Sequence, residues 1–224
     1  MREILADVSL VAVKDLKIEL RSRVLVNQVV PFALLVLLLF GIALDADQGT
    51  LRSFASGLFW IAILLCTLLA VQRSSAIERL DDAVTGLRLS SLSTFSLFLG
   101  KTTAVFVQIL ILEVLLTGGI IFFYRSSIED LFLLILTGLT AGIAIAATGT
   151  LYGAMVAGLG VRETLLPILL LPVLAPILIG AVRAFDDALG VGLVNGWTWL
   201  ALLAASAVFL ITVGALAHQL LLED

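Results

Sequence analysis

Six long apolar stretches, separated by short polar connections, are the feature that most constrains this chain. Each runs for about 20 residues or more, the length at which an α-helix crosses a hydrocarbon core of roughly 30 Å. We place them at residues 25–44, 54–72, 102–124, 131–157, 164–184 and 197–221. Of the 224 residues, 61% are hydrophobic and 13% are charged, about half the charged share of a typical soluble domain. The sequence therefore predicts an all-α integral membrane protein with a single transmembrane domain, residues 1–224.

The placement of Lys and Arg predicts the direction of the spans. Ten of these 13 residues lie before the first stretch, in the connection 73–101, or at Arg162 between the fourth and fifth stretches. The other side has only Arg52, Arg125 and Arg183, in short acidic connections. Because Lys and Arg are enriched in cytoplasmic loops, we expect both termini in the cytoplasm and no extracytoplasmic domain. A cleaved signal peptide is not expected, since segment 1–24 mixes acids and bases.

Segment 1–24 carries too many charges to span a membrane, but its apolar residues recur at helical spacing. This pattern predicts an amphipathic helix lying in the membrane interface, where its Lys and Arg residues would meet anionic headgroups. The alternative is a helix packed on its own bundle. The apolar residues are Ile4, Leu5, Val8, Val11 and Ala12.

The fourth stretch contains a ridge of small residues at steps of three or four, which places them on one helix face. Small residues let two helix backbones approach closely in lipid. The ridge therefore indicates helix packing, either within one subunit or at a seam between two copies. Its glycines are Gly138, Gly142, Gly149 and Gly153.

The fifth stretch contains three prolines, Pro167, Pro172 and Pro176. Each removes a backbone N–H and presses on the carbonyl four residues earlier, so kinks or a break are expected. Pro31 is expected to bend the first stretch in the same way. The kinks are either static or a moving hinge, and the freed carbonyls argue against a plain lipid-facing helix.

The connection 73–101 contains a second amphipathic pattern, expected on the cytoplasmic side. Ile77, Leu80, Val84 and Leu87 repeat at helical spacing, and the opposite face is polar. This predicts a short helix whose polar face either meets a partner protein or is only solvated. The polar residues are Glu78, Asp81, Asp82, Thr85 and Arg88.

Gly100-Lys101-Thr102 has the form of the end of a phosphate-binding loop, but the rest of that motif is missing. The motif needs a glycine five positions before its second glycine, and Phe95 stands there. We therefore expect this chain to bind no ATP and to be non-catalytic, so that any ATP is hydrolysed by another subunit.

Two polar residues fall inside the third stretch, Glu113 near its middle and Gln108. An intramembrane carboxyl group is a functional-site hypothesis by default, because it is costly to bury. Gln108 or a neighbouring Thr is a candidate hydrogen-bond partner. The carboxyl group serves either a structural hydrogen bond between helices or a role in transport.

The chain offers few metal or haem ligands, with one Cys, Cys66, and one His, His218. Cys66 is expected to be a small buried hydrophobic residue, and His218 an interfacial polar residue at the end of the last stretch. Trp197, Trp199 and Tyr124 are expected to form an aromatic belt at the outer interface. No metal site, directly bound cofactor or nucleic-acid partner is predicted.

Several motifs together resemble those of the CcmB family, the membrane subunits of the ABC transporter of cytochrome c maturation. The second stretch resembles the second span of that family, and the triple-proline segment 166–178 resembles its fifth. The connection 73–101 resembles the family loop Glu-x-x-x-Asp-Gly, Leu-Ser-Pro and Gly-Lys, with Ala83 and Ser91 replacing the usual Gly and Pro. The matching residues are Phe59-Trp60-Ile61-Ala62, Glu78, Asp82, Leu87, Leu89-Ser90 and Gly100-Lys101.

The resemblance covers nearly the whole chain and implies a permease half of a type-2 ABC exporter-like complex in the cytoplasmic (inner) membrane. Two copies would pair with two copies of the ATPase CcmA, and act with CcmC, CcmD and the haem chaperone CcmE. Segment 73–101 would contain the coupling helix. The residues that it would present to CcmA are Glu78, Arg79, Asp81, Asp82 and Arg88.

ATP in that complex would serve either haem export or release of haem-loaded CcmE, with haem at most an indirect substrate of this chain. Two alternatives stay open at this stage. One is a type-2 exporter permease for another substrate, such as a lipid or a drug, and the other is a membrane scaffold without transport activity.

Overall fold

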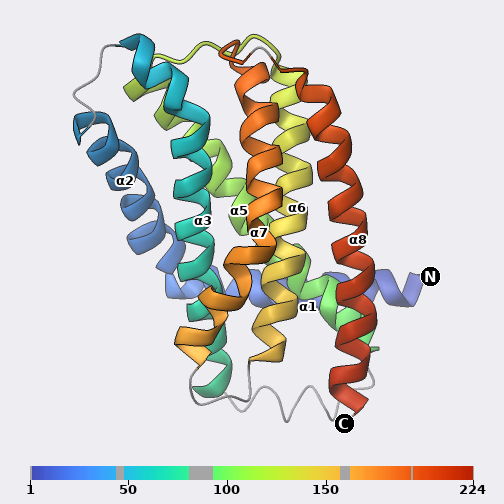
Figure 1. The fold of residues 1–224 in the computed structure, drawn as a ribbon. Helices are drawn as coiled ribbons and strands as arrows, with labels where there is room; N and C mark the ends of the chain where they lie inside the picture. Colours follow the sequence, from blue (N-terminus) through green and yellow to red (C-terminus); the bar gives the residue numbers. More distant parts are fainter. Residues whose placement is uncertain (1, 44–47, 81–92, 157–161, 193, 224) are drawn as a thin grey trace.

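The computed structural model describes residues 2–43, 48–80, 93–156, 162–192 and 194–223, and it is a bundle of long helices running side by side (Figure 1). Its elements, in chain order, are α1 (Arg2–Ser22), a π-helical turn η1 (Leu25–Val29), α2 (Val30–Ala43), α3 (Gln48–Leu80), α5 (Thr94–Tyr124), α6 (Leu131–Met155), α7 (Arg162–Ala188) and α8 (Gly196–Glu223).

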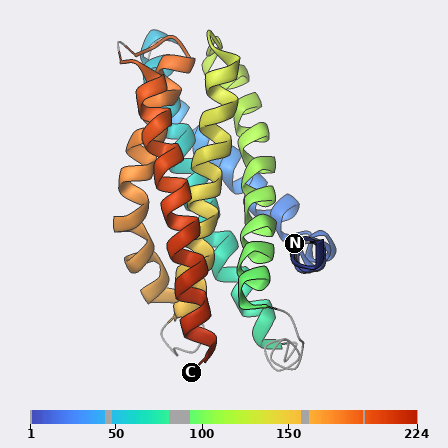
Figure 2. The ribbon, with the colours of Figure 1, turned by 90° about the vertical axis from the view of Figure 1, so that its right-hand side faces the viewer.

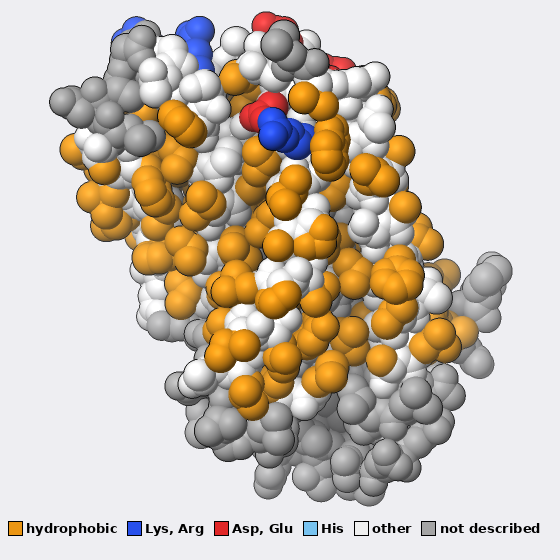
Figure 3. Space-filling model, in the orientation of Figure 1, with side chains coloured by type: hydrophobic (Ala, Val, Ile, Leu, Met, Phe, Trp, Pro, Cys, Tyr) orange, Lys and Arg blue, Asp and Glu red, His pale blue; other side chains and the backbone are white. Residues whose placement is uncertain are grey.

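Six helical segments of the described chain are long and apolar enough to cross a membrane, which confirms the predicted all-α membrane architecture. Five begin and end within a few residues of the predicted bounds. The third begins at Thr94, earlier than predicted, because the Ser93 side chain caps the helix by accepting from the Ser96 N–H. Figure 3 shows hydrophobic side chains over the side of the bundle and charged ones gathered near its upper end.

Helix α1 runs across the other helices rather than along them (Figure 1), and Figure 2 shows it nearly end-on beside α5. Val11 and Ala12 are buried. The opposite face exposes apolar side chains, among them Leu10, Val13 and Leu20. One face therefore packs on the bundle, while the other has the apolar character that an interfacial position requires.

The corner between α1 and the first span is built from two residues. Arg23 adopts φ 51°, in the left-handed region that ends helices. The Glu19 carboxylate then accepts a hydrogen bond from the Leu25 N–H at 2.8 Å, which satisfies a free donor at the start of the next helix. The chain can therefore turn from the α1 direction into the bundle without leaving these groups unpaired.

Prolines distort α2 and α7 differently. The π-helical turn η1 stands directly before Pro31, which cannot donate to the carbonyl four residues earlier. Helix α7 continues through Pro167, Pro172 and Pro176, and Figure 1 shows it bent toward the lower end of α3. Pro172 and Pro176 are exposed on this subunit, because the leucines at 166, 170 and 174 form the buried stripe.

Helix α6 lies at the centre of the bundle, in contact with α5, α7 and α8. Its predicted ridge glycines, Gly138, Gly142, Gly149 and Gly153, are all buried within this one subunit. That burial favours packing inside the subunit over a seam between copies. Cys66 is also buried, as predicted, and its Sγ lies 3.8 Å from the Val29 carbonyl oxygen.

The sequence predicts Tyr124 in an aromatic belt, and this prediction is wrong. Tyr124 is buried between α5 and α2. Its hydroxyl donates to the Leu37 carbonyl oxygen at 2.6 Å. An ideal Cβ on Gly41 would lie 3.2 Å from the Tyr124 ring, so the glycine lets the ring reach across. Trp197, in contrast, is exposed and lies 5.9 Å from the Phe132 ring, centroid to centroid.

Tyr124→Phe is expected to lower the free energy of unfolding by about 1 kcal/mol, because the ring stays while the hydrogen bond to α2 is lost. Unfolding of the purified protein by sodium dodecyl sulfate, followed by tryptophan fluorescence, measures the change. Tyr152→Phe, which removes the hydroxyl of a half-buried tyrosine in α6, is the control. If the two variants were equally stable, the hydrogen bond from the Tyr124 hydroxyl would not contribute to holding α2 against α5.

Candidate functional site

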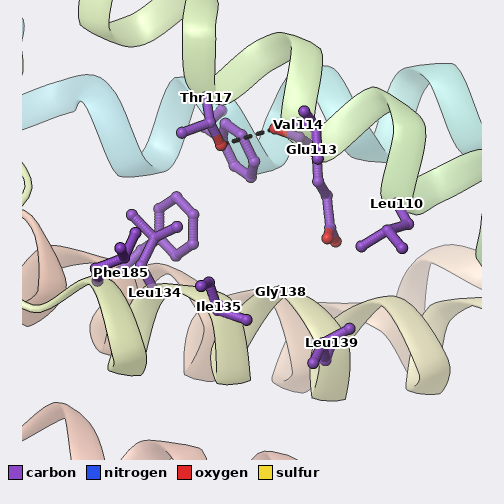
Figure 4. A pocket seen from close by; sticks show the side chains of 11 residues that line it. Leu110, Glu113, Val114, Thr117, Leu134, Ile135, Gly138, Leu139 and Phe185 are labelled. Carbon is purple, nitrogen blue, oxygen red and sulfur yellow. Dashed lines mark hydrogen bonds between the residues drawn. The ribbon is translucent and has the colours of Figure 1, made fainter.

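A cleft between α5 and α6 contains the intramembrane carboxyl group that the sequence singled out. Its volume is about 260 Å³, and its walls come from α3, α5, α6 and α7. The lining is apolar apart from Glu113 and Thr117 (Figure 4). The other lining residues are Phe59, Leu110, Val114, Leu131, Leu134, Ile135, Gly138, Leu139 and Phe185.

Glu113 extends from α5 toward α6 (Figure 4), and its side chain is only 6% exposed. Gly138 and Gly142 on α6 provide the room. An ideal Cβ on Gly138 would lie 2.8 Å from Glu113 Oε2, and one on Gly142 would lie 3.2 Å from Oε1. Two of the four ridge glycines thus form a shallow groove in α6 that holds the carboxyl group.

The carboxyl group has no partner among the described residues. Oε1 is fully buried without a hydrogen bond, and neither ion pair of the described chain involves Glu113. Thr117 donates to the Glu113 backbone oxygen at 2.7 Å rather than to the carboxyl group (Figure 4). Gln108 is buried in the same helix but makes no recorded hydrogen bond to Glu113. The group is therefore free to accept a hydrogen bond or to pair with a cation.

The cleft opens sideways, on the face of the bundle that is apolar. Val114, Leu131 and Ile135 line it and are 66%, 57% and 47% exposed, respectively. At its inner side lie Phe59 and Phe185, which are buried and stacked with their ring centroids 4.7 Å apart. The site thus has an apolar entrance, an aromatic wall and a single carboxyl group.

The predicted docking residues are only partly within the described chain. Asp81, Asp82 and Arg88 lie outside the described residues. Glu78 and Arg79 belong to the last turns of α3, where the structure describes the course of the helix but not the side chains. The docking role of these five residues stays a prediction.

The helices on either side of residues 81–92 run up to that connection, since α3 ends at Leu80 and α5 begins at Thr94. Helix α3 continues from Arg73 to Leu80, about 12 Å of helix beyond the apolar run. Residues Thr94 to Lys101 form the first turns of α5, with Gly100 packed under Val11 of α1. Gly100-Lys101-Thr102 is therefore helical rather than part of a phosphate-binding loop.

The sequence singled out Glu113 but not its surroundings. In the sequence Phe59 is only part of a family motif, and no pattern points to Phe185. The glycine ridge was recognised as a close-packing face without indication that a carboxyl group occupies part of it. A mid-span carboxyl group combined with a glycine pair one turn apart on the next span is the signal that could have suggested the groove.

Comparison with known proteins gives two matches. Residues 6–223 match the model of the family described as CcmB protein. The heme exporter protein B of Haemophilus influenzae is 26% identical over 204 residues, which cover 91% of this chain and 91% of that protein.

Proposed function

Because the chain belongs to the CcmB family, we propose that it is the membrane-spanning permease subunit of an ABC transporter acting in cytochrome c maturation. It is a multi-pass membrane protein with six apolar helices in its described part. In this proposal it lies in the inner membrane with both termini in the cytoplasm. It pairs with a second copy and with the ATPase CcmA, and works alongside CcmC, CcmD and CcmE.

The observation that carries the proposal is the family match over residues 6–223, nearly the whole chain. The relative named heme exporter protein B covers the chain to a similar extent, which supports haem handling by the complex. ATP hydrolysed by CcmA would drive either haem export or the release of haem-loaded CcmE. At about 260 Å³, the α5/α6 cleft is below the usual size of pockets for drug-sized ligands, so it does not support direct haem binding there.

The fold supports coupling to a cytoplasmic ATPase through residues 81–92. Helix α3 runs without a break to Leu80 and α5 begins at Thr94, so a continuous helix leads from each end of the connection into the bundle. Movement applied to it would pass along α3 and α5 into the bundle. Since the cleft residues Phe59 and Glu113 belong to these two helices, that movement would change the positions of the cleft walls.

Affinity isolation of the tagged chain from its native membranes tests the proposal. We expect an ATPase subunit of the CcmA type and CcmC among the bound proteins, with ATPase activity that depends on the complex. Recovery with a different exporter ATPase would favour the exporter alternative. Recovery without any ATPase would favour the scaffold.

Replacing both Glu78 and Asp82 with Lys is expected to reduce recovery of the ATPase subunit about tenfold or more, because the change reverses two charges at the proposed docking surface. Membrane insertion should be unchanged. The measurement is the ratio of ATPase subunit to tagged chain after isolation. Glu129→Lys, an exposed charge reversal in the α5–α6 connection, is the control. Full recovery with the double variant would remove the docking role from these residues.

A further inference from the structure

We propose that the α5/α6 cleft binds the ammonium group of a lipophilic amine that enters sideways from the lipid, with Glu113 as its counter-ion. Binding of the amine does not require the ATPase partner proposed above. The occupant is a simple alkylamine, whose charged head lies in the cleft and whose chain remains in lipid.

The first argument is the unsatisfied carboxyl group. Glu113 is 6% exposed, and its Oε1 has no hydrogen-bond partner, although it lies at membrane depth. Buried polar groups without partners cost several kcal/mol in an apolar medium, so native structures normally satisfy them. Among the described residues no Lys, Arg or His pairs with Glu113, and a donor from a ligand would fill this role.

The second argument is the composition of the walls. A primary ammonium group has three N–H donors and a positive charge. The carboxyl group can accept from it, and the buried rings of Phe59 and Phe185 form an apolar wall of the same cleft that excludes water from the pair. The remaining lining residues are apolar apart from the Thr117 hydroxyl, which already donates to a backbone oxygen. The cleft is therefore complementary to a cation joined to a hydrocarbon chain.

The third argument is the direction and depth of the entrance. Val114, Leu131 and Ile135 are exposed at the cleft on an apolar side of the bundle, so a ligand would arrive through lipid. Glu113 lies about 16 Å along α5 from Tyr124, near the middle of the span. A phospholipid amine stays at the headgroup level, far from this depth. A volume of about 260 Å³ suits an amine head with a few methylene groups.

Photolabelling of the full-length protein in phosphatidylcholine nanodiscs tests the proposal. The probe is dodecylamine carrying a diazirine near the amine, and the matched probe is dodecanol with the same diazirine. We expect the amine to label peptides containing residues 110–117 and 131–139 about tenfold more than the alcohol does, which corresponds to about 1.4 kcal/mol. Equal labelling by the two probes in the unmodified chain would overturn the proposal, because the cleft would then hold hydrocarbon only.

Variants of Glu113 test whether the preference for the amine over the alcohol depends on this carboxyl group. Glu113→Gln should reduce amine labelling to the level of the alcohol, whereas Glu113→Asp, which retains the charge, should preserve part of the preference. Glu129→Gln, a carboxyl group exposed in the α5–α6 connection, should leave it unchanged. Amine preference that survives in Glu113→Gln would also overturn the proposal. Since the comparison of probes in the unmodified chain stands by itself, the test holds even where a variant fails to fold.

Discussion

Gly138→Ala is expected to destabilise the bundle by about 1 kcal/mol or less, because the atom that the new methyl group meets is the movable end of the Glu113 side chain. The new Cβ would lie 2.8 Å from Glu113 Oε2, closer than real Cβ atoms come to other heavy atoms. Either α5 and α6 separate or the carboxyl group leaves its groove. Denaturation of the purified protein in mixed micelles gives the free energy of unfolding.

Gly118→Ala is the matched control on α5, since nothing lies within 4 Å of its ideal Cβ. There the methyl group meets open space, and alanine is the better helix former, so stability should stay the same or rise by up to about 1 kcal/mol. In a Glu113→Ala background, the cost of Gly138→Ala should largely disappear, because the atom that it meets is gone. An undiminished cost in that background would mean that the groove does not serve the carboxyl group.

Gly100→Leu is expected to destabilise the protein by about 3 kcal/mol or more and to loosen α1 from the bundle. An ideal Cβ on Gly100 would lie 2.6 Å from Val11 Cβ and 3.0 Å from the Val8 carbonyl oxygen. The second of these atoms belongs to the α1 backbone and has no rotamer by which to move away. Protease cleavage within α1 should become faster in the variant, alongside the loss of stability.

Gly118→Leu controls for placing leucine in α5, because its side chain would point into open space. It should leave both stability and α1 cleavage close to those of the unmodified chain. If Gly100→Leu behaved like Gly118→Leu, the packing of α1 on α5 would not depend on the absence of a side chain at position 100.

The same glycine shows how sequence and structure differ in what they report. In the sequence, Gly100-Lys101 was part of a family motif and a failed phosphate-loop match, and neither gave a physical reason for a glycine. The structure supplies one, because α1 crosses α5 at this position. A crossing between segments almost 90 residues apart leaves no local pattern, so it could not have been predicted from spacing.

Glu113 and Tyr124 are two further residues whose surroundings could not be predicted from the sequence. The carboxyl group was recognised because its type is unusual at that depth, but its surroundings come from four different helices. Tyr124 was assigned to an aromatic belt because it stands at the end of a span, where tyrosine is common. It is buried instead because α2 offers the Leu37 carbonyl oxygen and a glycine beside the ring.

The sequence by itself determined the six membrane spans, the amphipathic nature of α1 and the close-packing face of α6. These properties depend on length, hydropathy and helical period, which are local and hold for any arrangement of the helices. The tertiary structure alone decided which residue the Gly138–Gly142 groove receives, where α1 crosses and which side of α7 carries its prolines. Each of these depends on how the helices are oriented against one another, and that orientation is set by contacts between residues far apart in the chain.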